Sequence, residues 1–456
     1  MLSLSSTAYK TAPIWGQELV LSGRGFLREI LRGGPLLHRS YEDLAISQWL
    51  NKPDWQKLQL EKLTSVLSQA AKTIPFYKTR FAACGFDANA PLKWADIERI
   101  PILSKREIID AGDSISAPLA KLRGVKGKTS GTTGTSLEGY RTHRSILREA
   151  AFITRQLQWA GYKTGEPRVW LRGDEIVPLT NVQAPYWRFN RAENMLMMSS
   201  FHLSEQNAPL YLEALEKFDP VLIQAYPTSI TYLAKWLQNN DRRYQGKRLR
   251  GIVTSSEAMP ADAKKIIEQS MGCRVFDWYG SFERVSAIGT CEFGNHHIQE
   301  DYGYTELIPL DDGSHEIIGT GFDNSLMPLI RYRSVDSVIL GDSDYACPCG
   351  RTFRVVDKVL GRQDDTIITK DGKTHIMPDF IFGGVAHLVE AQIIQDRLDA
   401  IRLRVVPGPK FGQEQVDQLT LNAQERFGSS VNISVELVES IPRTANGKFR
   451  CSISNL

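Results

Sequence analysis

The chain has 456 residues, of which 42% are hydrophobic and 23% are charged, and its formal net charge is +3. These values are typical of a globular protein with a sizeable core, and the length predicts two or three domains. The near balance of charge, without a basic aromatic patch, argues against a nucleic-acid partner. No apolar run approaches the roughly 18 residues of a membrane-spanning helix.

The N-terminus lacks the charged start and apolar core of a secretion signal. The six cysteines are few for the length and are not spaced as a disulfide framework. We therefore expect a reducing, cytoplasmic setting. We expect a monomer or a homodimer.

Residues 1–125 are predicted to form a mainly helical entry region. The stretch from Tyr41 to Phe86 has helical spacing of apolar residues with a break near Pro53, and the pattern ends at Pro75. Further on, Ser104 and Glu107 have the spacing of a capping box, which predicts a helix start.

Beyond residue 165, short apolar runs alternate with helix-like stretches. The runs 168–171, 221–224 and 249–254 predict buried strands, and 229–238 and 260–271 predict helices. This alternation indicates an α/β fold with a largely parallel sheet. Residues 315–340 add a strand-rich region, so we expect mixed sheets in the large domain.

The pattern changes again near Gly361. Residues 401–406 and 431–438 predict strands, and residues 413–427 predict an amphipathic helix. The last stretch of about 95 residues is large enough for a small α+β domain. We therefore expect an N-terminal domain over 1–361 and a C-terminal domain over 362–456, joined by a hinge.

The segment from Lys128 to Ser136 combines two glycines with six hydroxyl side chains. Glycines let the backbone approach a ligand closely, and successive N–H groups with hydroxyls can bind phosphate oxygens. The same composition fits a solvated loop. It is not a Walker A loop, because no lysine follows either glycine.

Four more segments follow the Gly/Thr loop in order. They are Asp277-Trp-Tyr-Gly-Ser-Phe-Glu283, Arg331-Tyr-Arg-Ser-Val-Asp336, Gly361-Arg-Gln-Asp-Asp365 and Ile441-Pro-Arg-Thr-Ala-Asn-Gly-Lys-Phe-Arg450. With these segments the chain resembles the adenylate-forming superfamily over roughly residues 41–456. It is most like the phenylacetate–CoA ligase branch, including CapK-like proteins, in Phe76-Tyr77, Pro101–Lys105 and Gln299–Asp301.

The resemblance implies a two-step reaction. A carboxylic acid, expected to be an aryl or arylacetic acid, attacks the α-phosphorus of ATP and gives acyl-AMP and pyrophosphate. Coenzyme A then captures the acyl group; the alternatives are an amine acceptor on a sugar or amino acid, or a non-catalytic nucleotide-binding relative. The developing phosphate charge requires fixed donors and cations, and Mg²⁺ requires a carboxylate ligand.

The resemblance also implies roles for individual residues. The catalytic residues would be Lys448, which reaches the α-phosphate, and Glu283, which holds Mg²⁺. Asp336 would accept hydrogen bonds from the ribose, Arg362 would contact ribose or phosphate, and Asp364 would be the hinge. The other implied nucleotide contacts are Thr129, Ser130, Gly131, Thr132, Thr133, Gly134 and Thr135 in the phosphate loop, Ser256 and Glu257 beside the base, and Asp277, Trp278, Tyr279 and Gly280 near the adenine.

The sequence departs from the family pattern at three places. Phe282 replaces a hydroxyl residue, Val335 replaces a glycine, and the phosphate loop lacks a lysine after its second glycine. Each implied residue also has an ordinary interpretation: Asp336 as a turn residue, Glu283 as a solvated acid, and Lys448 as a surface lysine.

Three cysteines and a histidine suggest a tetrahedral structural zinc site, with about one zinc per chain. The predicted ligands are Cys291, His297, Cys347 and Cys349, and His296 competes for the fourth position. The alternative is that the cysteines are small buried hydrophobic residues.

The acid pocket is the part of the site that the sequence defines least. Its candidate lining residues are Tyr140, Trp170, Tyr226 and Trp278. Aromatic side chains would suit a ring substrate, but each of them fits the core equally well.

Overall fold

A computed structural model describes residues 4, 6–32, 35–128, 137–259, 262–342, 345–362, 367–370, 374–375, 381–444 and 447–456. The chain divides into two compact units. Unit 1 comprises Met1–Glu29, Ala160–Phe276 and Leu360–Leu456, and unit 2 comprises Ile30–Trp159 and Asp277–Val359. Within the described ranges, no helix has the combined length and apolarity to cross a membrane.

Unit 1 is built on a mainly parallel sheet. Its strands lie in the order β4 (Trp187–Asn190), β5 (Met195–Ser199), β3 (Arg168–Arg172), β6 (Leu222–Ala225) and β7 (Gly251–Ser255). The strands β5, β3, β6 and β7 are parallel, and β4 is antiparallel to β5. The predicted strands near 168, 221 and 249 are thus confirmed as β3, β6 and β7.

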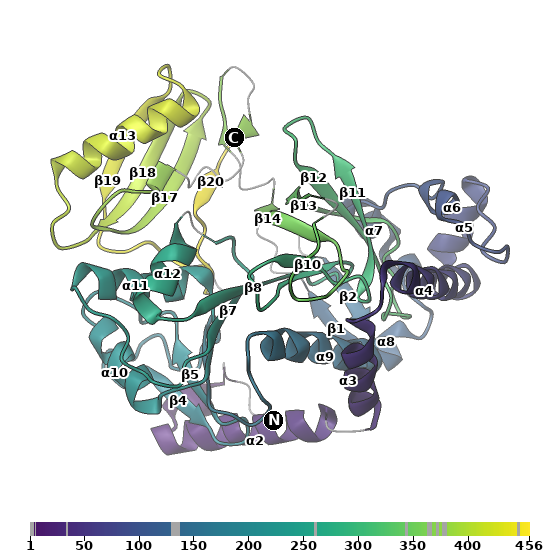
Figure 1. Cartoon of the computed structure of the whole chain (residues 1–456), viewed down its shortest axis with the longest axis horizontal. Coiled ribbons are helices and arrows are strands. Elements are labelled where there is room, and N and C mark those ends of the chain that lie inside the picture. The colour runs from purple at the N-terminus through teal and green to yellow at the C-terminus, as the bar shows by residue number, and fades with distance from the viewer. Residues whose placement is uncertain are drawn as a thin grey trace. The chain divides into compact units, whose positions relative to one another are not determined.

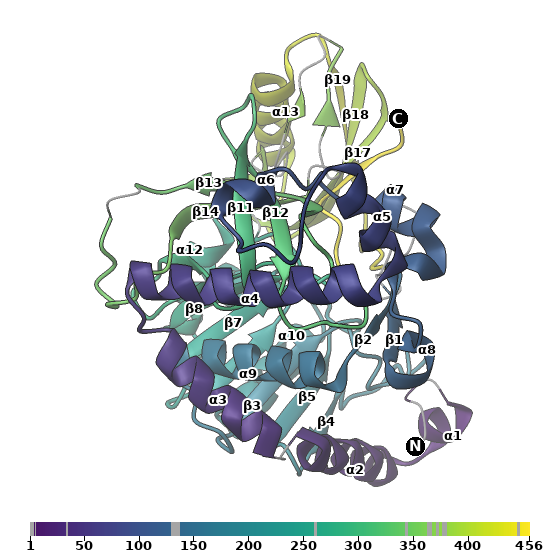
Figure 2. The same cartoon turned by 90° about the vertical axis from the view of Figure 1, so that its right-hand side faces the viewer.

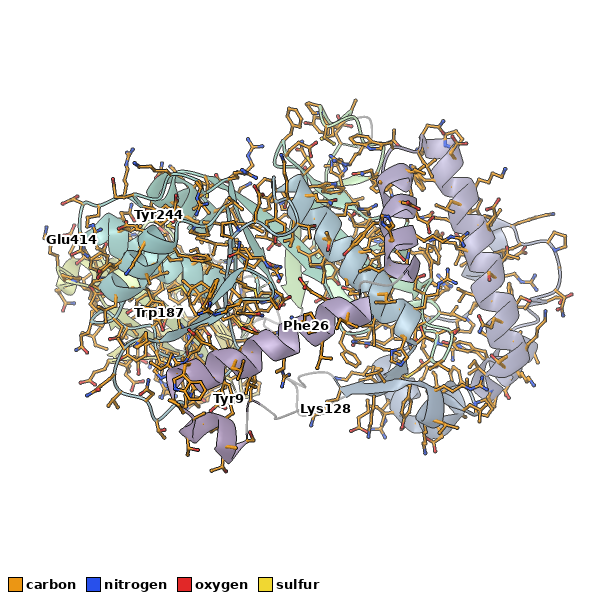
Figure 3. The ribbon with its side chains drawn as sticks, turned by 90° about the horizontal axis from the view of Figure 1, so that it is seen from below. Tyr9, Phe26, Lys128, Trp187, Tyr244 and Glu414 are labelled. Carbon is orange, nitrogen blue, oxygen red and sulfur yellow. The ribbon has the colours of Figure 1, made fainter. Side chains whose placement is uncertain are left out.

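Three helices share a hydrophobic core with this sheet: α10 (Ala208–Phe218), α11 (Pro227–Asn239) and α12 (Ala263–Met271). Their core residues include Leu212, Leu233 and Ile267, each with no exposed surface. The two predicted helices at 229–238 and 260–271 are confirmed as α11 and α12. The N-terminal helices α1 (Thr7–Thr11) and α2 (Ile14–Arg32) precede this sheet, and side chains of α2 contact β4 (Figure 3).

The C-terminal part of unit 1 forms a separate sheet in the order β19 (Asn432–Leu437), β18 (Ala400–Pro407), β17 (Leu388–Arg397) and β20 (Ser452–Ser454). Helix α13 (Gln413–Phe427) packs on one face of this sheet (Figure 1). The short strands β15 (Ile367–Ile368) and β16 (Thr374–His375) pair with each other. The predicted strands at 401–406 and 431–438 and the helix at 413–427 are confirmed.

Unit 2 begins with three helices, α3 (Pro35–Ser47), α4 (Lys52–Thr73) and α5 (Pro75–Ala83). They confirm the helical prediction for Tyr41–Phe86, and the break lies at residues 48–51. Asn51 caps α4 by accepting a hydrogen bond from the Asp54 amide over 3.0 Å. Helix α9 (His143–Trp159) packs beside α3 (Figure 2). The short helices are α6 (Trp94–Glu98), α7 (Lys105–Ala111), η1 (Gly112–Ile115) and α8 (Ala120–Arg123).

The predicted capping box is present at the start of α7. The Ser104 amide donates to Glu107 Oε2 over 2.8 Å, and the Glu107 amide donates to Ser104 Oγ over 3.2 Å. Both otherwise unpaired backbone donors are thereby satisfied.

The strands of unit 2 run in the order β11 (Gly303–Pro309), β12 (His315–Gly321), β13 (Tyr332–Leu340), β14 (Val355–Arg362), β10 (His296–Ile298), β9 (Ala287–Thr290) and the end of β8 (Arg274–Gly280). Neighbours such as β11 and β12 are antiparallel, because a short turn joins them. A separate hairpin pairs β1 (Val125–Lys128) with β2 (Glu138–Arg141). The sheets of the protein are therefore mixed, as expected.

Candidate functional site

Tyr279 and Asp336 form a hydrogen-bonded pair in unit 2. Tyr279 lies near the end of β8, and its hydroxyl donates to Asp336 Oδ2 on β13 over 2.7 Å. The Asp336 amide in turn donates to Ser334 Oγ over 3.2 Å. Burial, reinforced by the neighbouring Asp336 charge, raises the pKa of Tyr279 well above its ordinary value. Tyr279 is therefore a neutral donor that holds the aspartate in place.

Glu283 follows β8 and is half-buried. Its Oε1 accepts a hydrogen bond from the hydroxyl of Tyr332 over 3.2 Å. The next residue, Arg284, has a φ of 55° and donates from its guanidinium to the Ser145 carbonyl over 2.9 Å. This contact fixes the backbone that follows Glu283 against α9. The Glu283 carboxylate offers oxygen ligands of the kind that Mg²⁺ binds.

Phe282 departs from the family pattern, and the structure gives it a packing role. The Arg141 guanidinium lies 3.7 Å from the centre of its ring. A Cβ at Gly127 would lie 2.9 Å from a ring carbon of Phe282, so β1 passes directly over the ring. Burial lowers the pKa of Arg141 to about 10. Phe282 therefore anchors the hairpin that carries the predicted phosphate loop.

The loop residues themselves lie outside the described residues. These are Thr129, Ser130, Gly131, Thr132, Thr133, Gly134 and Thr135. The same holds for the predicted hinge Asp364 and for the side chain of Arg362.

Lys448 lies in unit 1, within a tight turn. The Thr444 amide donates to the Lys448 carbonyl over 2.9 Å, and the Lys448 amide donates to Thr444 Oγ1 over 3.1 Å. Gly447 has a φ of 68°, and a Cβ there would lie 2.6 Å from the Cα of Gly173. Only glycine fits this position, because a side chain would meet backbone. The turn of Lys448 is therefore seated against the loop after β3.

Glu257 holds the residue next to Lys448. Its Oε1 accepts a hydrogen bond from the Phe449 amide over 2.7 Å. Its Oε2 accepts from Thr228 Oγ1 over 2.7 Å, at the start of α11. Burial raises the pKa of Glu257 above its ordinary value. Glu257 and Phe449 are separated by 192 residues in the sequence, so no local pattern indicates this contact.

Ser256 is exposed and has a φ of 73°. Its Oγ accepts a hydrogen bond from the Arg172 guanidinium over 2.5 Å. Arg172 lies 4.8 Å from the ring centre of Trp170 and 5.1 Å from that of Tyr226, and burial lowers its pKa. Two of the aromatic residues proposed for the acid pocket thus surround one arginine.

The remaining predicted residues have framework contacts. The Asp277 amide donates to Thr290 Oγ1 over 2.9 Å. Trp278 is buried, and Gly280 ends β8. The structure therefore groups Tyr279, Glu283 and Asp336 in unit 2, and groups Ser256, Glu257 and Lys448 in unit 1.

The predicted zinc ligands are brought together in unit 2. The ligand atoms of Cys291, His297, Cys347 and Cys349 all lie within 4.8 Å of one another, and all four residues are buried. His297 Nδ1 lies 3.0 Å from the Phe353 carbonyl, and its Nε2 lies 3.4 Å from Cys349 Sγ. His296 Nδ1 instead contacts Thr290 Oγ1 over 3.1 Å. His297 is therefore the histidine of this cluster.

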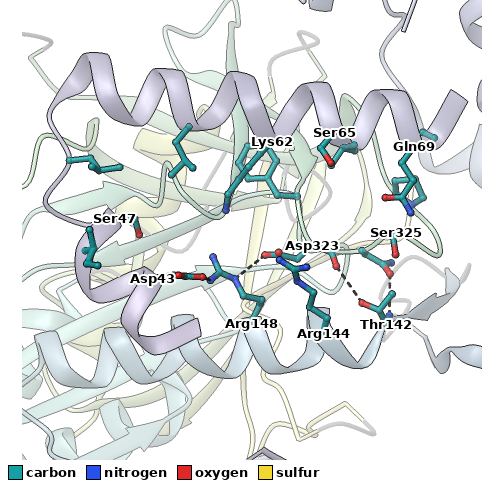
Figure 4. A pocket seen from close by; sticks show the side chains of 18 residues that line it. Asp43, Ser47, Lys62, Ser65, Gln69, Thr142, Arg144, Arg148, Asp323 and Ser325 are labelled. Atoms are coloured by element: carbon teal, nitrogen blue, oxygen red, sulfur yellow. Dashed lines mark hydrogen bonds and ion pairs between the residues drawn. The ribbon is translucent and has the colours of Figure 1, made fainter. Parts of the chain in front are cut away.

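Unit 2 also contains a cavity of about 600 Å³ between α3, α4, α9 and the loop after β12 (Figure 4). Lys62 of α4 points into it, and Arg148 pairs with Asp43 over 3.4 Å and with Asp323 over 3.5 Å. Burial lowers the pKa of Lys62. None of the predicted site residues lines this cavity among those the structure describes.

Comparison with known proteins relates the chain to CapK and to phenylacetate-coenzyme A ligases. Residues 367–455 match the family model of the CapK C-terminal domain. The chain is 25% identical to Protein CapK of Staphylococcus aureus over 452 residues, which is 98% of this chain and 99% of that protein. It is 26% identical to the phenylacetate-coenzyme A ligase of Escherichia coli (strain K12) over 336 residues, which is 69% of this chain and 72% of the ligase.

Solved structures agree with this relation at the level of the fold. A 2-hydroxyisobutyryl-CoA ligase in the postadenylation state matches with a TM-score of 0.69 and 19% identity, over 90% of this chain and 91% of the ligase. The fold is thus that of the adenylate-forming ligases. The homologues of the chain are CapK and the phenylacetate–coenzyme A ligases, which confirms the resemblance expected from its five ordered segments.

Proposed function

We propose that this protein is an AMP-forming ligase that adenylates a carboxylic acid and then transfers the acyl group to coenzyme A. The observation that carries the proposal is the pair of carboxylates in unit 2, Asp336 and Glu283, each held by a tyrosine hydroxyl. The naming of several homologues as phenylacetate-coenzyme A ligases supports the same reaction class and favours an aryl or arylacetic acid.

In the first step, a carboxylate oxygen of the acid attacks the α-phosphorus, and the bond from that phosphorus to pyrophosphate breaks. Lys448 supplies a positive charge to the developing phosphate and carboxylate oxygens. Asp336 accepts hydrogen bonds from the ribose. Glu283 would hold Mg²⁺, which when bound neutralises charge on the phosphate oxygens.

The loop of Thr129, Ser130, Gly131, Thr132, Thr133, Gly134 and Thr135 positions the departing pyrophosphate. In the second step, the thiol sulfur attacks the acyl carbon, the bond from that carbon to the AMP oxygen breaks, and the thiol proton is released to solvent. Rotation of the C-terminal domain 362–456 about Asp364, relative to 1–361, removes Lys448 and admits the thiol. ATP and coenzyme A as co-substrates favour the cytoplasm as its location.

Zinc in the Cys/His cluster is part of the proposal. Three thiols and an imidazole are the donors of a closed structural zinc site. The contact of His297 Nδ1 with the Phe353 carbonyl supports this, because it leaves Nε2 for the metal. The ion would tie the turn after β9 to the turn at residues 347–349.

The deciding test is acid-dependent ATP–pyrophosphate exchange with a panel of aryl, arylacetic and aliphatic acids. We expect exchange with at least one ring acid. ATP binding without exchange across the panel would assign the chain to non-catalytic relatives.

A second candidate acceptor is an amine on a sugar or amino acid. Residues 367–455, which match the CapK C-terminal domain, govern the second step in the proposed scheme, and this match does not itself distinguish an amine from a thiol. Adding coenzyme A or amines to the preformed adenylate, and identifying the thioester or amide by mass spectrometry, separates the two.

A further inference from the structure

Helix α2 packs on the protein through a side that combines polar residues with Leu21, which is 4% exposed and lies in a hydrophobic cluster with Met195 and Met197. Gln17 is only 3% exposed, and its Oε1 accepts a hydrogen bond from the Arg188 guanidinium over 2.5 Å. Glu18 accepts from the Phe189 amide over 3.0 Å, and Ser22 Oγ accepts from the Arg191 amide over 3.0 Å. Three polar side chains of α2 therefore bind β4 and its end.

Close packing at Gly25 reinforces this orientation. A Cβ at Gly25 would lie 2.7 Å from the side-chain oxygen of Asn190, so a larger residue would displace the Asn190 side chain where α2 meets β4. One turn further, Arg28 pairs with Glu193 over 3.4 Å. Contacts from Gln17 to Arg28 thus hold α2 in one rotational setting.

The opposite side of α2 is apolar and faces solvent (Figure 3). Trp15 is 70% exposed, Leu19 66%, Phe26 58% and Ile30 56%. Their spacings of four, seven and four residues place them in one line along the helix, with Gly23 between them. An ordinary surface helix buries such a line, whereas α2 leaves this one exposed and buries Leu21 on its other side. We name these four side chains the α2 stripe.

The size of the α2 stripe argues against a second copy of the chain as its partner. The helix from Trp15 to Ile30 is about 24 Å long and about 10 Å wide. Two copies of this helix face packed against each other would bury about 500 Å² of surface in total. A stable protein interface buries roughly 1,200 Å² or more.

A lipid surface fits the α2 stripe better. A single exposed ridge of tryptophan, phenylalanine and aliphatic side chains, on a helix that lies flat, is the form in which helices bind the membrane interface. The sequence of α2 has three arginines against two glutamates, which favours anionic lipid.

We infer that α2 docks the protein on an anionic membrane surface through the α2 stripe, without crossing the bilayer. Burial of the four side chains among lipid chains provides the attraction. The polar side of α2 stays on β4, so the catalytic parts of the chain need not rearrange. This inference is independent of the acid or acceptor used.

Co-sedimentation of the full-length protein with vesicles of phosphatidylglycerol and phosphatidylcholine tests it. We expect binding that weakens in high salt and on pure phosphatidylcholine. The double variant Leu19→Gln/Phe26→Gln should bind the vesicles at least about tenfold more weakly than the unmodified protein. A matched control, Leu421→Gln/Leu437→Gln, removes two leucines that are 50% and 56% exposed elsewhere and should bind like the unmodified protein.

Failure of the unmodified protein to sediment, or equal binding by both double variants, would overturn the inference. So would a dimer in sedimentation velocity that the Leu19→Gln/Phe26→Gln variant abolishes without any vesicle binding. If that variant does not fold, quenching by brominated lipid provides a second test. Quenching should be stronger in the unmodified protein than in Trp15→Phe, and equal quenching would contradict the docking.

Discussion

Glu257 accepts the backbone hydrogen of Phe449 over 2.7 Å, and Phe449 directly follows Lys448. The same carboxylate binds Thr228 at the start of α11. A side chain of the parallel-sheet part of unit 1 therefore fixes the backbone from which Lys448 extends. On the proposed function, Glu257 is a positioning residue for the lysine.

Lys448→Ala should lower acid-dependent ATP–pyrophosphate exchange by about a hundredfold or more, because the transition state loses its fixed cation. Thioester formation from supplied acyl-AMP should fall much less. The control Lys265→Ala removes an exposed lysine of α12 and should leave both rates unchanged. An equal loss of both half-reactions in Lys448→Ala would reject the domain-alternation scheme.

Gly447→Ala should abolish most exchange activity, since the new Cβ would meet the backbone of Gly173. Gly428→Ala is the matched control, because Gly428 also has a positive φ, of 98°, but its Cβ would have space. Gly428→Ala should lose about 1–2 kcal/mol of stability from the positive φ, and Gly447→Ala should lose more because its Cβ also meets backbone. If the two variants keep the same ATP–pyrophosphate exchange activity, the contact of the Lys448 turn with Gly173 is unimportant for catalysis.

The pH dependence of stability should report the burial of Glu257. Because the pKa of Glu257 is raised in the folded chain, the folded protein keeps this proton to higher pH than the unfolded chain does. The contribution of Glu257 to stability is then complete below the unfolded pKa and is lost as pH rises through the folded pKa. The free energy of unfolding of the unmodified protein, relative to Glu257→Gln, should therefore fall as pH rises above about 4.

Urea unfolding at a series of pH values measures this difference. The exposed Glu439→Gln variant controls for general charge effects. If the difference in free energy of unfolding between the unmodified protein and Glu257→Gln does not change with pH, the pKa of Glu257 is the same in the folded and unfolded chain.

Tyr279→Phe should destabilise the protein by about 1–3 kcal/mol, because buried Asp336 loses a hydrogen-bond donor. In a double-mutant cycle with Asp336→Asn, measured by urea unfolding, the two changes should couple by about 0.5–3 kcal/mol. The KM for ATP should rise in both single variants. Additive effects on stability would mean that the contact contributes nothing.

Purification without chelator should give about one zinc per chain by elemental analysis. Cys349→Ser should lower both the zinc content and the Tm, because the closed site loses a ligand. Cys84→Ser, outside the cluster, should change neither. Protein without stoichiometric zinc, and with an unchanged Tm after chelation, would contradict the structural zinc.

Periodicity predicted the elements whose apolar residues face the core. The helix at 413–427 and the strands at 168, 221 and 249 follow from such patterns. Helix α2 could not be oriented in this way, because one apolar line points to solvent while Leu21 and several polar side chains pack on the protein. The choice between His296 and His297 depends on which face of β10 each occupies, and this requires the pairing of β10 with β9.

The candidate site was predictable as a set of residue types but not as a set of contacts. The order of the motifs singled out Glu283, Asp336 and Lys448 as candidates, and their roles stay predictions. The sequence motif shows that Phe282 stands where the adenylate-forming pattern has a hydroxyl residue. Only the structure shows that Phe282 packs on Gly127 and Arg141. Contacts across large sequence separations, such as Glu257 with Phe449, leave no local pattern.

The hydrogen bonds from α2 to β4 have a further consequence for solubility. β4 is the terminal strand of its sheet, and an unpaired strand edge is a template for adding a strand from another molecule. Glu18 and Ser22 occupy the outward amides of Phe189 and Arg191, which such a strand would use. A form of the protein that began after residue 32 would uncover this edge, so we expect it to aggregate through β4.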